Sequence, residues 1–385
     1  MEPPRARAPD QAAVWTNRGT ARAERGDHQG AIADHTRALE LAPGLANAWI
    51  SRGLAREATG DLAGAIADQT RAIELAPEHP YGWENRAMAR AAQGDLVGAL
   101  GDHTQAIERE PGRAASWLLR GMTRLTSRDP AGASADYSRA LELDPRMVDA
   151  WVGRARARHA SGDLDGAVAD ATRALELEPR SARAVEVRAL AREARGDLPG
   201  ALDDYTRAIE LAPREARVWL NRARARGLLH DYAGMRADCT RALELAPALA
   251  EAWYTRGLAC TRLGDLQAAI ADLTRAVELD PRHAAAWKNL GVARANSGDH
   301  SGALADFSRA LELAPDDDAE AWSFRGRLRA ALHDRAGARA DLARSLELAP
   351  EACRATAEPA SRHLERARGA AGCGLEGAGG EARRH

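Results

Sequence analysis

Tryptophan recurs in this sequence at a fixed step of 34 residues, and this period restricts the fold more strongly than any other feature. The step joins positions 15, 49, 83, 117, 151, 219, 253 and 287. Val185 stands where the series would place another tryptophan, and Trp322 arrives one residue late. A period of this size indicates tandem copies of one structural unit. Ten copies account for residues 12–352 of the 385-residue chain.

One copy, residues 46–79, shows how each unit is expected to fold. Small and apolar residues at three- and four-residue steps predict one helix over 46–59 and a second helix after it. Gly60 suits the left-handed end of the first helix, and Asp61 follows as the N-cap of the second. Pro77 ends the second helix, because proline has no backbone N–H to donate. The unit is therefore a helical hairpin. A single hairpin cannot bury its own inner face, so the copies must stack.

The ten predicted repeats are followed below by place, counted from the first residue of each repeat, so that Trp49 has place four. They span residues 12–45, 46–79, 80–113, 114–147, 148–181, 182–215, 216–249, 250–283, 284–318 and 319–352. Residues 1–11 are predicted to be a disordered lead. Residues 353–385 are predicted to contain a weak capping helix and a disordered glycine-rich tail.

The recurrent places carry a resemblance to a known family. Tryptophan stands at place four, glycine or alanine at eight, alanine at twenty and twenty-seven, and proline at thirty-two. This pattern resembles the tetratricopeptide repeat over nearly nine tenths of the chain. Asn17-Arg18-Gly19 is similar to the Asn-Arg-Gly variant of that repeat. The resemblance implies an all-α fold, a right-handed α-solenoid of ten hairpins, with a concave groove that binds a protein or peptide.

Composition argues against several classes of partner. The net charge of −2 arises from arginines and acids that balance within each repeat, which argues against a nucleic-acid or membrane surface. No apolar run reaches the length of a membrane span, and the start of the chain has no apolar signal region. The four cysteines do not suggest a disulfide framework. The expected location is the cytoplasm. Lys288 is the only lysine beside 53 arginines, which indicates a GC-rich bacterial genome.

The sequence contains no residue set that supports catalysis, a metal or a cofactor. Residues 372–377 match G-x-G-x-x-G, but no strand precedes them, so the dinucleotide interpretation fails. The acids at 316–318 and Glu320 precede a predicted helix, where acidic side chains cap the N-terminus. His35 and His103 take place twenty-four, where tyrosine or phenylalanine stands in sister repeats, so a packing role is expected. We predict that the protein is not an enzyme.

The resemblance assigns the concave face to places two, five, six, nine, twelve and thirteen of the first helices. In repeats two to four these places hold the predicted partner-binding residues, mostly apolar: Ile50, Leu54, Tyr81, Asn85, Met88, Leu118, Leu119, Met122 and Leu125. Exposed methionines suit an adaptable protein or peptide site. Repeats five to seven turn charged, with Asp149, Arg156, Arg183, Glu186, Arg217 and Arg224. The competing interpretation is that some of these side chains cover one another in a tight superhelix.

A clamp for a terminal carboxylate, which the family also contains, is not predicted here. Lys288 and Asn289 match its beginning, but Val292, Glu320 and Phe324 do not continue it.

A ladder of ion pairs is predicted from arginine at place seven in nine repeats and aspartate at place twenty-three in all ten. Antiparallel helices bring these places together either within a repeat or with the preceding repeat. Repeat nine separates the alternatives, because Leu290 replaces its arginine. Pairing within repeats would leave Asp306 without its partner, and backward pairing would leave Asp272 without one. We favour pairing within repeats.

These observations predict a non-catalytic protein–protein interaction scaffold that holds a protein or peptide segment in its concave groove. The alternative is a peptide-sensing regulatory protein. No cofactor, nucleic acid or membrane is expected as a partner, and the sequence does not indicate an oligomeric state.

Overall fold

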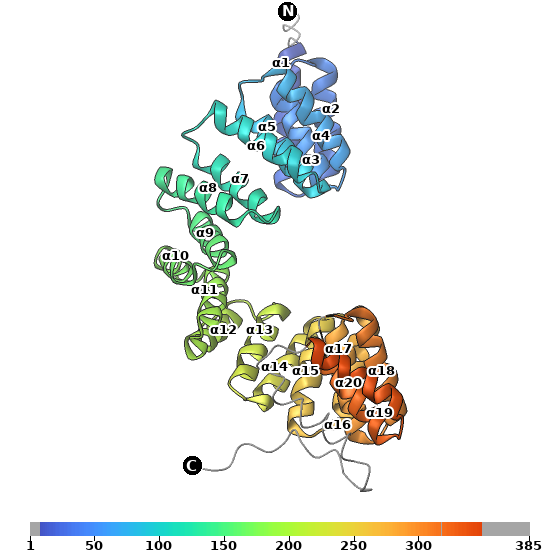
Figure 1. The fold of residues 1–385 in the computed structure, drawn as a ribbon. Coiled ribbons are helices and arrows are strands. Elements are labelled where there is room, and N and C mark those ends of the chain that lie inside the picture. The colour runs from blue at the N-terminus through green and yellow to red at the C-terminus, as the bar shows by residue number, and fades with distance from the viewer. Residues whose placement is uncertain (1–7, 317, 349–385) are drawn as a thin grey trace, which may run out of the picture. The chain divides into compact units, whose positions relative to one another are not determined.

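The computed structural model describes residues 8–316 and 318–348, and this part of the chain contains α-helices and no strand (Figure 1). The helices are α1 Ala8–Glu24, α2 His28–Leu41, α3 Ala46–Ala58, α4 Leu62–Leu75, α5 Pro80–Gln93, α6 Leu96–Arg109, α7 Ala114–Thr126, α8 Pro130–Leu143, α9 Val148–Ala160, α10 Leu164–Leu177, α11 Ala182–Arg195, α12 Leu198–Leu211, α13 Ala216–Leu228, α14 Tyr232–Leu245, α15 Ala250–Leu263, α16 Leu266–Leu279, α17 Ala284–Ser297, α18 His300–Leu313, α19 Ala319–Ala331 and α20 Arg335–Leu348.

The helices form hairpins, each of which corresponds to one repeat, so the predicted all-α solenoid fold is confirmed. The handedness of its superhelix stays a prediction. One local prediction is wrong: the lead was expected to be disordered to residue 11, but α1 begins at Ala8. The predicted capping helix, the glycine-rich tail and the G-x-G-x-x-G match lie outside the described residues.

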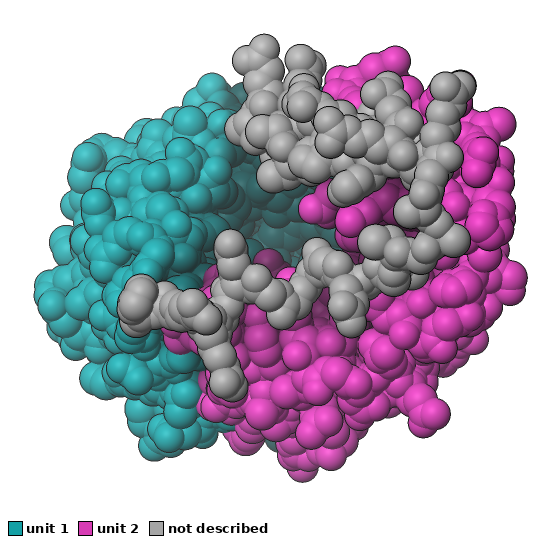
Figure 2. All heavy atoms as spheres, turned by 60° about the horizontal axis from the view of Figure 1, so that its bottom comes forward, with its two compact units in different colours: residues 1–212 teal, residues 213–385 magenta. Residues whose placement is uncertain are grey.

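The chain divides into two compact units, residues 1–212 and residues 213–385, coloured teal and magenta in Figure 2. Unit 1 contains α1–α12, and unit 2 contains α13–α20. Within unit 1 the second helix of each repeat packs against the first helix of the next repeat of the unit, as α4 packs against α5. The same holds within unit 2, where α14 packs against α15.

The turn inside each hairpin depends on two residues, as the sequence predicts: the one that ends the first helix and the one that caps the second. Gly60 has φ +85°, the left-handed conformation that glycine adopts without steric cost. The Asp61 carboxylate accepts the Gly64 backbone N–H at 2.9 Å, which caps α4. Gly64 must be small, because a Cβ built there would lie 2.1 Å from Asp61 Oδ2. Aspartate takes the same capping position in all the other hairpins.

Small residues also set the spacing of the helices. A Cβ on Gly121 of α7 would come within 2.9 Å of the Tyr137 ring of α8, so glycine at place eight makes room for the large side chain at place twenty-four. Tyr137 is fully buried for this reason. His35 and His103 take the same buried place, which confirms the predicted packing role. Burial lowers the pKa of His103 to about 4, so this ring is neutral at physiological pH.

The recurrent tryptophans lie at the edge of the core. All nine are half-buried, and none belongs to the fully buried core. Trp151 Nε1 donates to the Pro145 carbonyl at 2.9 Å, and the Arg154 guanidinium lies 4.7 Å from its ring centroid. The tryptophans other than Trp15 therefore hold the linker that precedes them, and those other than Trp287 have one face against an arginine.

Three turns depart from glycine. Arg128, His230 and His333 have φ values of 63°, 62° and 65° at the place where the other turns have glycine. A side chain with a Cβ is strained in this left-handed conformation, by about 1–2 kcal/mol per residue.

We predict that Arg128→Gly stabilises unit 1 by about 0.5–1 kcal/mol, because it relieves this strain at an exposed position. Thermal unfolding followed by circular dichroism measures the change. Gly162→Ala is the matched control: it places a Cβ at a φ of 84° in the next hairpin and should lower the melting temperature. An unchanged melting temperature for Arg128→Gly would show that the turn is not strained.

Candidate protein-binding surface

Arginine at place seven pairs with aspartate at place twenty-three of its own repeat, as we favoured from the sequence. Arg52 Nε lies 2.9 Å from Asp68 Oδ2, and Arg52 Nη2 lies 2.7 Å from Oδ1. This two-point contact matches the planar guanidinium to the carboxylate. It recurs in every described repeat that has the arginine, from Arg18–Asp34 to Arg325–Asp341.

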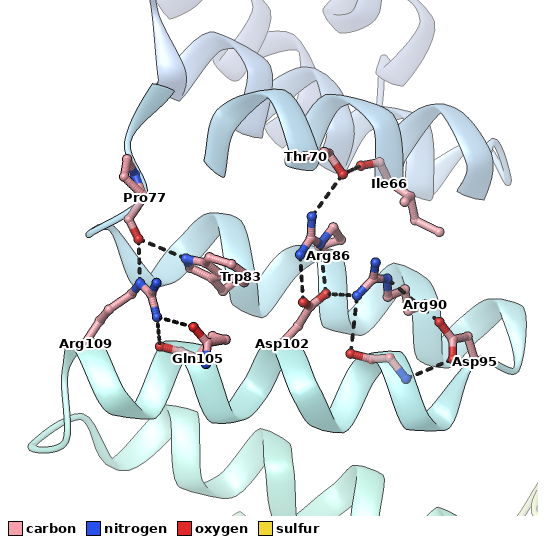
Figure 3. A network of polar contacts seen from close by, with 11 residues as sticks. Ile66, Thr70, Pro77, Trp83, Arg86, Arg90, Asp95, Asp102, Gln105 and Arg109 are labelled. Carbon is pink, nitrogen blue, oxygen red and sulfur yellow. Dashed lines mark hydrogen bonds and ion pairs between the residues drawn. The ribbon is translucent and has the colours of Figure 1, made fainter. Parts of the chain in front are cut away.

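The same guanidinium also reaches the preceding repeat. In repeat three, Arg86 pairs with Asp102, and its Nη1 donates to Thr70 Oγ1 of α4 at 3.1 Å (Figure 3). Trp83 stacks beneath it, 5.0 Å from ring centroid to guanidinium carbon. One side chain of α5 thus contacts α4 and α6, so it fixes the rotation of the first helix between two second helices.

A second arginine, at place eleven, completes the site, and the sequence analysis did not assign it this role. Arg90 Nη1 lies 2.8 Å from Asp102 Oδ2 and 3.4 Å from the Gly98 carbonyl, and its Nε lies 3.8 Å from the capping Asp95 (Figure 3). Two guanidinium groups therefore share one buried carboxylate. Recurrence of arginine at both places was the signal that could have revealed the triad.

Repeat nine corrects one consequence drawn from the sequence. Pairing within repeats was expected to leave Asp306 without a partner, because Leu290 replaces the place-seven arginine. Arg294 at place eleven instead lies 2.8 Å from both Asp306 oxygens. Burial outweighs this single arginine and raises the pKa of Asp306 to about 6. In repeat one, by contrast, the hydrogen bond from Arg18 lowers the pKa of Asp34.

The arginine ladder determines which side chains of the first helices remain exposed. A helix advances by about 100° per residue, so place nine lies about 200° from place seven, on the opposite side of the helix. Leu54, Met88 and Met122 hold place nine on α3, α5 and α7, and their exposed fractions are 41%, 39% and 49%. Tyr81 at place two is 40% exposed. These four residues are called the apolar strip, and their predicted exposure is confirmed.

The apolar strip runs across neighbouring helices of unit 1, because α3 contacts α5 and α5 contacts α7. The other predicted partner-binding residues, Ile50, Asn85, Leu118, Leu119 and Leu125, are half-buried. Leu118 and Leu125 pack against the buried cluster around Tyr137. These two side chains therefore contribute to the core, whereas the competing interpretation had some of the set covering one another. A role of the set in partner binding stays a prediction.

A buried acid beside the strip was missed. Glu84 at place five is 4% exposed, and its Oε1 accepts from Arg113 Nε at 3.1 Å and from Ser116 Oγ at 2.5 Å. Arg113 lies 4.5 Å above the Tyr81 ring and donates to its hydroxyl at 3.1 Å. Glu84 thus holds Arg113, which holds Tyr81 in the strip. The signal was an acid at a place where repeats two and four have isoleucine and leucine.

The place-nine row changes character at α9 of unit 1. Arg156 takes place nine there and is exposed, and α9 contacts α7. Asp149 and Arg183 pair with each other at 3.2 Å on the exposed surface. A row of three apolar side chains is therefore followed by a cation.

In unit 2, Arg224 of the predicted charged positions and Lys288 both form ion pairs within the chain. Arg224 lies 3.6 Å from Glu251. Lys288 Nζ lies 3.1 Å from Asp318 and 3.0 Å from Glu320, and Asp318 also caps α19. The capping role expected for the acidic linker holds at Asp318, while Asp317 lies outside the described residues.

The described residues show neither a cluster suited to a metal ion nor a helix suited to span a membrane. They contain no group of three His, Cys, Asp or Glu side chains placed to hold a metal ion. None of their helices is both long and apolar enough to cross a membrane.

Comparison with known proteins agrees with the repeat pattern. Profiles of the tetratricopeptide repeat match residues 46–79, 118–182, 160–216, 220–281 and 254–318. A tetratricopeptide repeat protein from Parabacteroides merdae superposes with a TM-score of 0.53 at 18% identity, over 65% of this chain and 98% of that one. PilF from Pseudomonas aeruginosa superposes with a TM-score of 0.50 at 18% identity, over 56% and 97% of the two chains. No curated protein matches the chain.

Asp306 of repeat nine is paired with a single arginine, so we expect the stability of unit 2 to depend on pH. The folded state holds the Asp306 proton up to about pH 6, whereas the ordinary pKa is 3.8, so stability is lost as the pH rises between these values. Leu290→Arg restores the second guanidinium and should stabilise unit 2 by about 1–2 kcal/mol above pH 6. Near pH 4 the gain should largely disappear.

Melting temperatures at pH 4, 5, 6 and 7.5 test this prediction. Leu290→Met changes the shape of the side chain without adding charge, so the wild-type pH profile should persist in that control. A gain from Leu290→Arg that is equal at all four pH values would contradict the assigned role of Asp306.

Proposed function

This chain belongs to the tetratricopeptide repeat family, and on that basis we propose that it is a non-catalytic scaffold that holds a protein or peptide segment against the apolar strip. The observation that carries the proposal is the exposure of Leu54, Met88 and Met122 at one place of three successive repeats. Exposed large apolar side chains gathered in one row, instead of scattered singly, favour an interaction surface.

The order of side chains along the place-nine row suggests the chemistry of the partner. Methionine side chains are flexible and adapt to apolar groups of different shape. Arg156 lies on α9, one repeat beyond Met122, and its guanidinium can pair with a carboxylate. We therefore propose a segment that places apolar side chains over α3, α5 and α7 and an acidic side chain near Arg156.

The polar cluster at Glu84 supports the same surface. Tyr81 is held by Arg113 before any partner binds, so less side-chain entropy is lost on binding than with a freely rotating ring. The hydroxyl and guanidinium also provide polar contacts at the edge of the strip.

The proposal places the protein in the bacterial cytoplasm, on composition alone. The peptide-sensing alternative would use the same strip with a short free peptide as the ligand.

We predict that Met88→Asp with Met122→Asp abolishes partner capture, because two charges would have to be desolvated inside an apolar contact. Val14→Asp with Val97→Asp is the matched control, since Val14 and Val97 are still more exposed, at 66% and 84%, but lie outside the strip. Both double variants should keep the wild-type helical circular dichroism.

Pull-down from a bacterial lysate with mass spectrometry provides the readout. The proposal requires a protein or peptide that the wild type and the valine variant retain and the methionine variant loses. Equal capture by all three proteins would overturn the role of the strip. If the methionine variant loses its helical signal, these methionines belong to the core.

A further inference from the structure

Repeat eight lacks the arginine that the nine other repeats have at place eleven, where Cys260 stands instead. In those nine repeats, the guanidinium lies 2.8–3.1 Å from the place-twenty-three aspartate and 3.5–3.9 Å from the capping aspartate; in repeats five and seven, for example, these contacts involve Arg158 and Arg226. In many of them it also donates to a carbonyl at the start of the second helix, as Arg226 does to Gly234 at 3.2 Å. The repeat thus has a standard binding position for a guanidinium group.

An open hollow lies beside this position in repeat eight. It has a volume of about 460 Å³ and is lined by residues of α14, α15 and α16, among them Arg236, Cys260, Ala268 and Asp272. The cysteine does not replace the arginine contact, because its Sγ lies 4.0 Å from Asp272 Oδ2.

The aspartate of the repeat-eight ion pair is slightly more exposed than its counterparts, whose side chains are 2–4% exposed. The side chains of Arg256 and Asp272 are 20% and 7% exposed, against 12% and 2% for Arg120 and Asp136 in repeat four. The Asp272 carboxylate is therefore slightly more accessible than the equivalent carboxylates of the other repeats.

The residue opposite Cys260 has changed in step with it. Repeats other than the eighth have glycine at place nineteen, and a Cβ on Gly234 would come 2.1 Å from the capping Asp231 and 2.9 Å from the Arg226 side chain. Repeat eight has Ala268 there, and the missing arginine removes the second of these two contacts. The backbone still follows the standard turn, since Asp265 Oδ1 accepts from Ala268 N at 3.2 Å. The acceptors of the standard position are thus retained, and the long contact from the Cys260 thiol to Asp272 stands in place of the guanidinium.

We propose that this hollow binds an alkylguanidinium group supplied from outside the chain. The Asp272 and Asp265 carboxylates and the Ala268 carbonyl would receive its N–H groups, as the equivalent groups receive those of arginine in the other repeats. The planar shape and the fixed directions of its donors select a guanidinium over an ammonium ion. The site lies in unit 2, so it does not depend on the apolar strip.

Arg236 is the resident competitor for this site. It replaces the mostly aliphatic residues of place twenty-one, and its Nη1 lies 3.9 Å from Asp265 Oδ2 with about half of its side chain exposed. Its charge balances the two carboxylates in the absence of a ligand. A bound guanidinium takes over the contact with Asp265, and Arg236 turns to solvent. Removing Arg236 therefore strengthens binding.

Equilibrium dialysis of the full-length protein with labelled methylguanidinium at constant ionic strength tests the proposal. Cys260→Arg with Ala268→Gly rebuilds the standard triad inside the chain and should weaken binding at least about tenfold, since hydrogen bonds to charged groups are lost to the ligand. Arg236→Leu should strengthen binding by about tenfold.

A gain-of-site variant supplies the complementary test. Arg158→Cys removes the place-eleven arginine of repeat five and exposes the same acceptors around Asp170, so bound methylguanidinium per protein should about double. Circular dichroism establishes that each variant is folded. Unchanged binding in the rebuilt variant, or equal binding of methylammonium, would overturn the proposal.

Two further ligands distinguish the sources of the guanidinium. N-acetyl-arginine methylamide represents an arginine side chain of a protein partner, and free L-arginine represents a metabolite. Tighter binding of the blocked amide assigns the site to a partner protein, and tighter binding of the free amino acid assigns it to a small molecule. Failure of both to compete with methylguanidinium would overturn the proposal.

Discussion

The rest of each repeat depends on one constraint, the burial of an aspartate carboxylate between two antiparallel helices. Asp68, Asp136 and Asp238 are each 2% exposed, and an ionised carboxylate at such a depth requires a counter-charge. The place-seven arginine meets this requirement with two parallel hydrogen bonds, and a third bond reaches the preceding repeat. Because a solenoid is stabilised by its repeats and the interfaces between neighbours, a contact that recurs at successive interfaces sets how the repeats stack within each unit.

The ladder of Arg–Asp ion pairs accounts for the orientation of the helices better than for the stability of the fold. Small residues such as Gly121 and Ala140 allow the helices to approach closely, but apolar contact alone tolerates rotation of a helix about its axis. A two-point guanidinium contact has a single productive orientation. With place seven turned inward, place nine faces outward, and Met88 and Met122 are exposed in the same row. The interaction surface is in this sense a consequence of the buried charge pair on the other side of the helix.

Local features were predictable from the sequence, and cooperative ones were not. The caps at Gly60 and Asp61 depend on neighbouring residues alone, so the hairpin followed directly from the 34-residue period. Pairing of Arg256 within its own repeat was favoured over pairing with the preceding repeat, yet the second arginine on each carboxylate was missed. Contacts such as that between Glu84 and Arg113 depend on how successive first helices pack. The sequence of a single repeat does not determine that packing. The division into two units was also missed, since the tryptophan period passes residue 212 without a change of step.

Repeats eight and nine each lose one arginine of the triad, and the outcomes differ with the size of the replacement. Leu290 is buried and fills the vacated volume with apolar atoms, so the charge imbalance appears in the raised pKa of Asp306. Cys260 is smaller than the arginine it replaces, and an open hollow lies beside it, lined also by Asp272 and by Arg236, about half of whose side chain is exposed. The intact repeats serve as internal references for both cases, because they show what each carboxylate binds when both arginines are present. A repeat protein can therefore acquire a ligand site by losing a side chain, provided that the replacement is small and the remaining backbone keeps its acceptors in place.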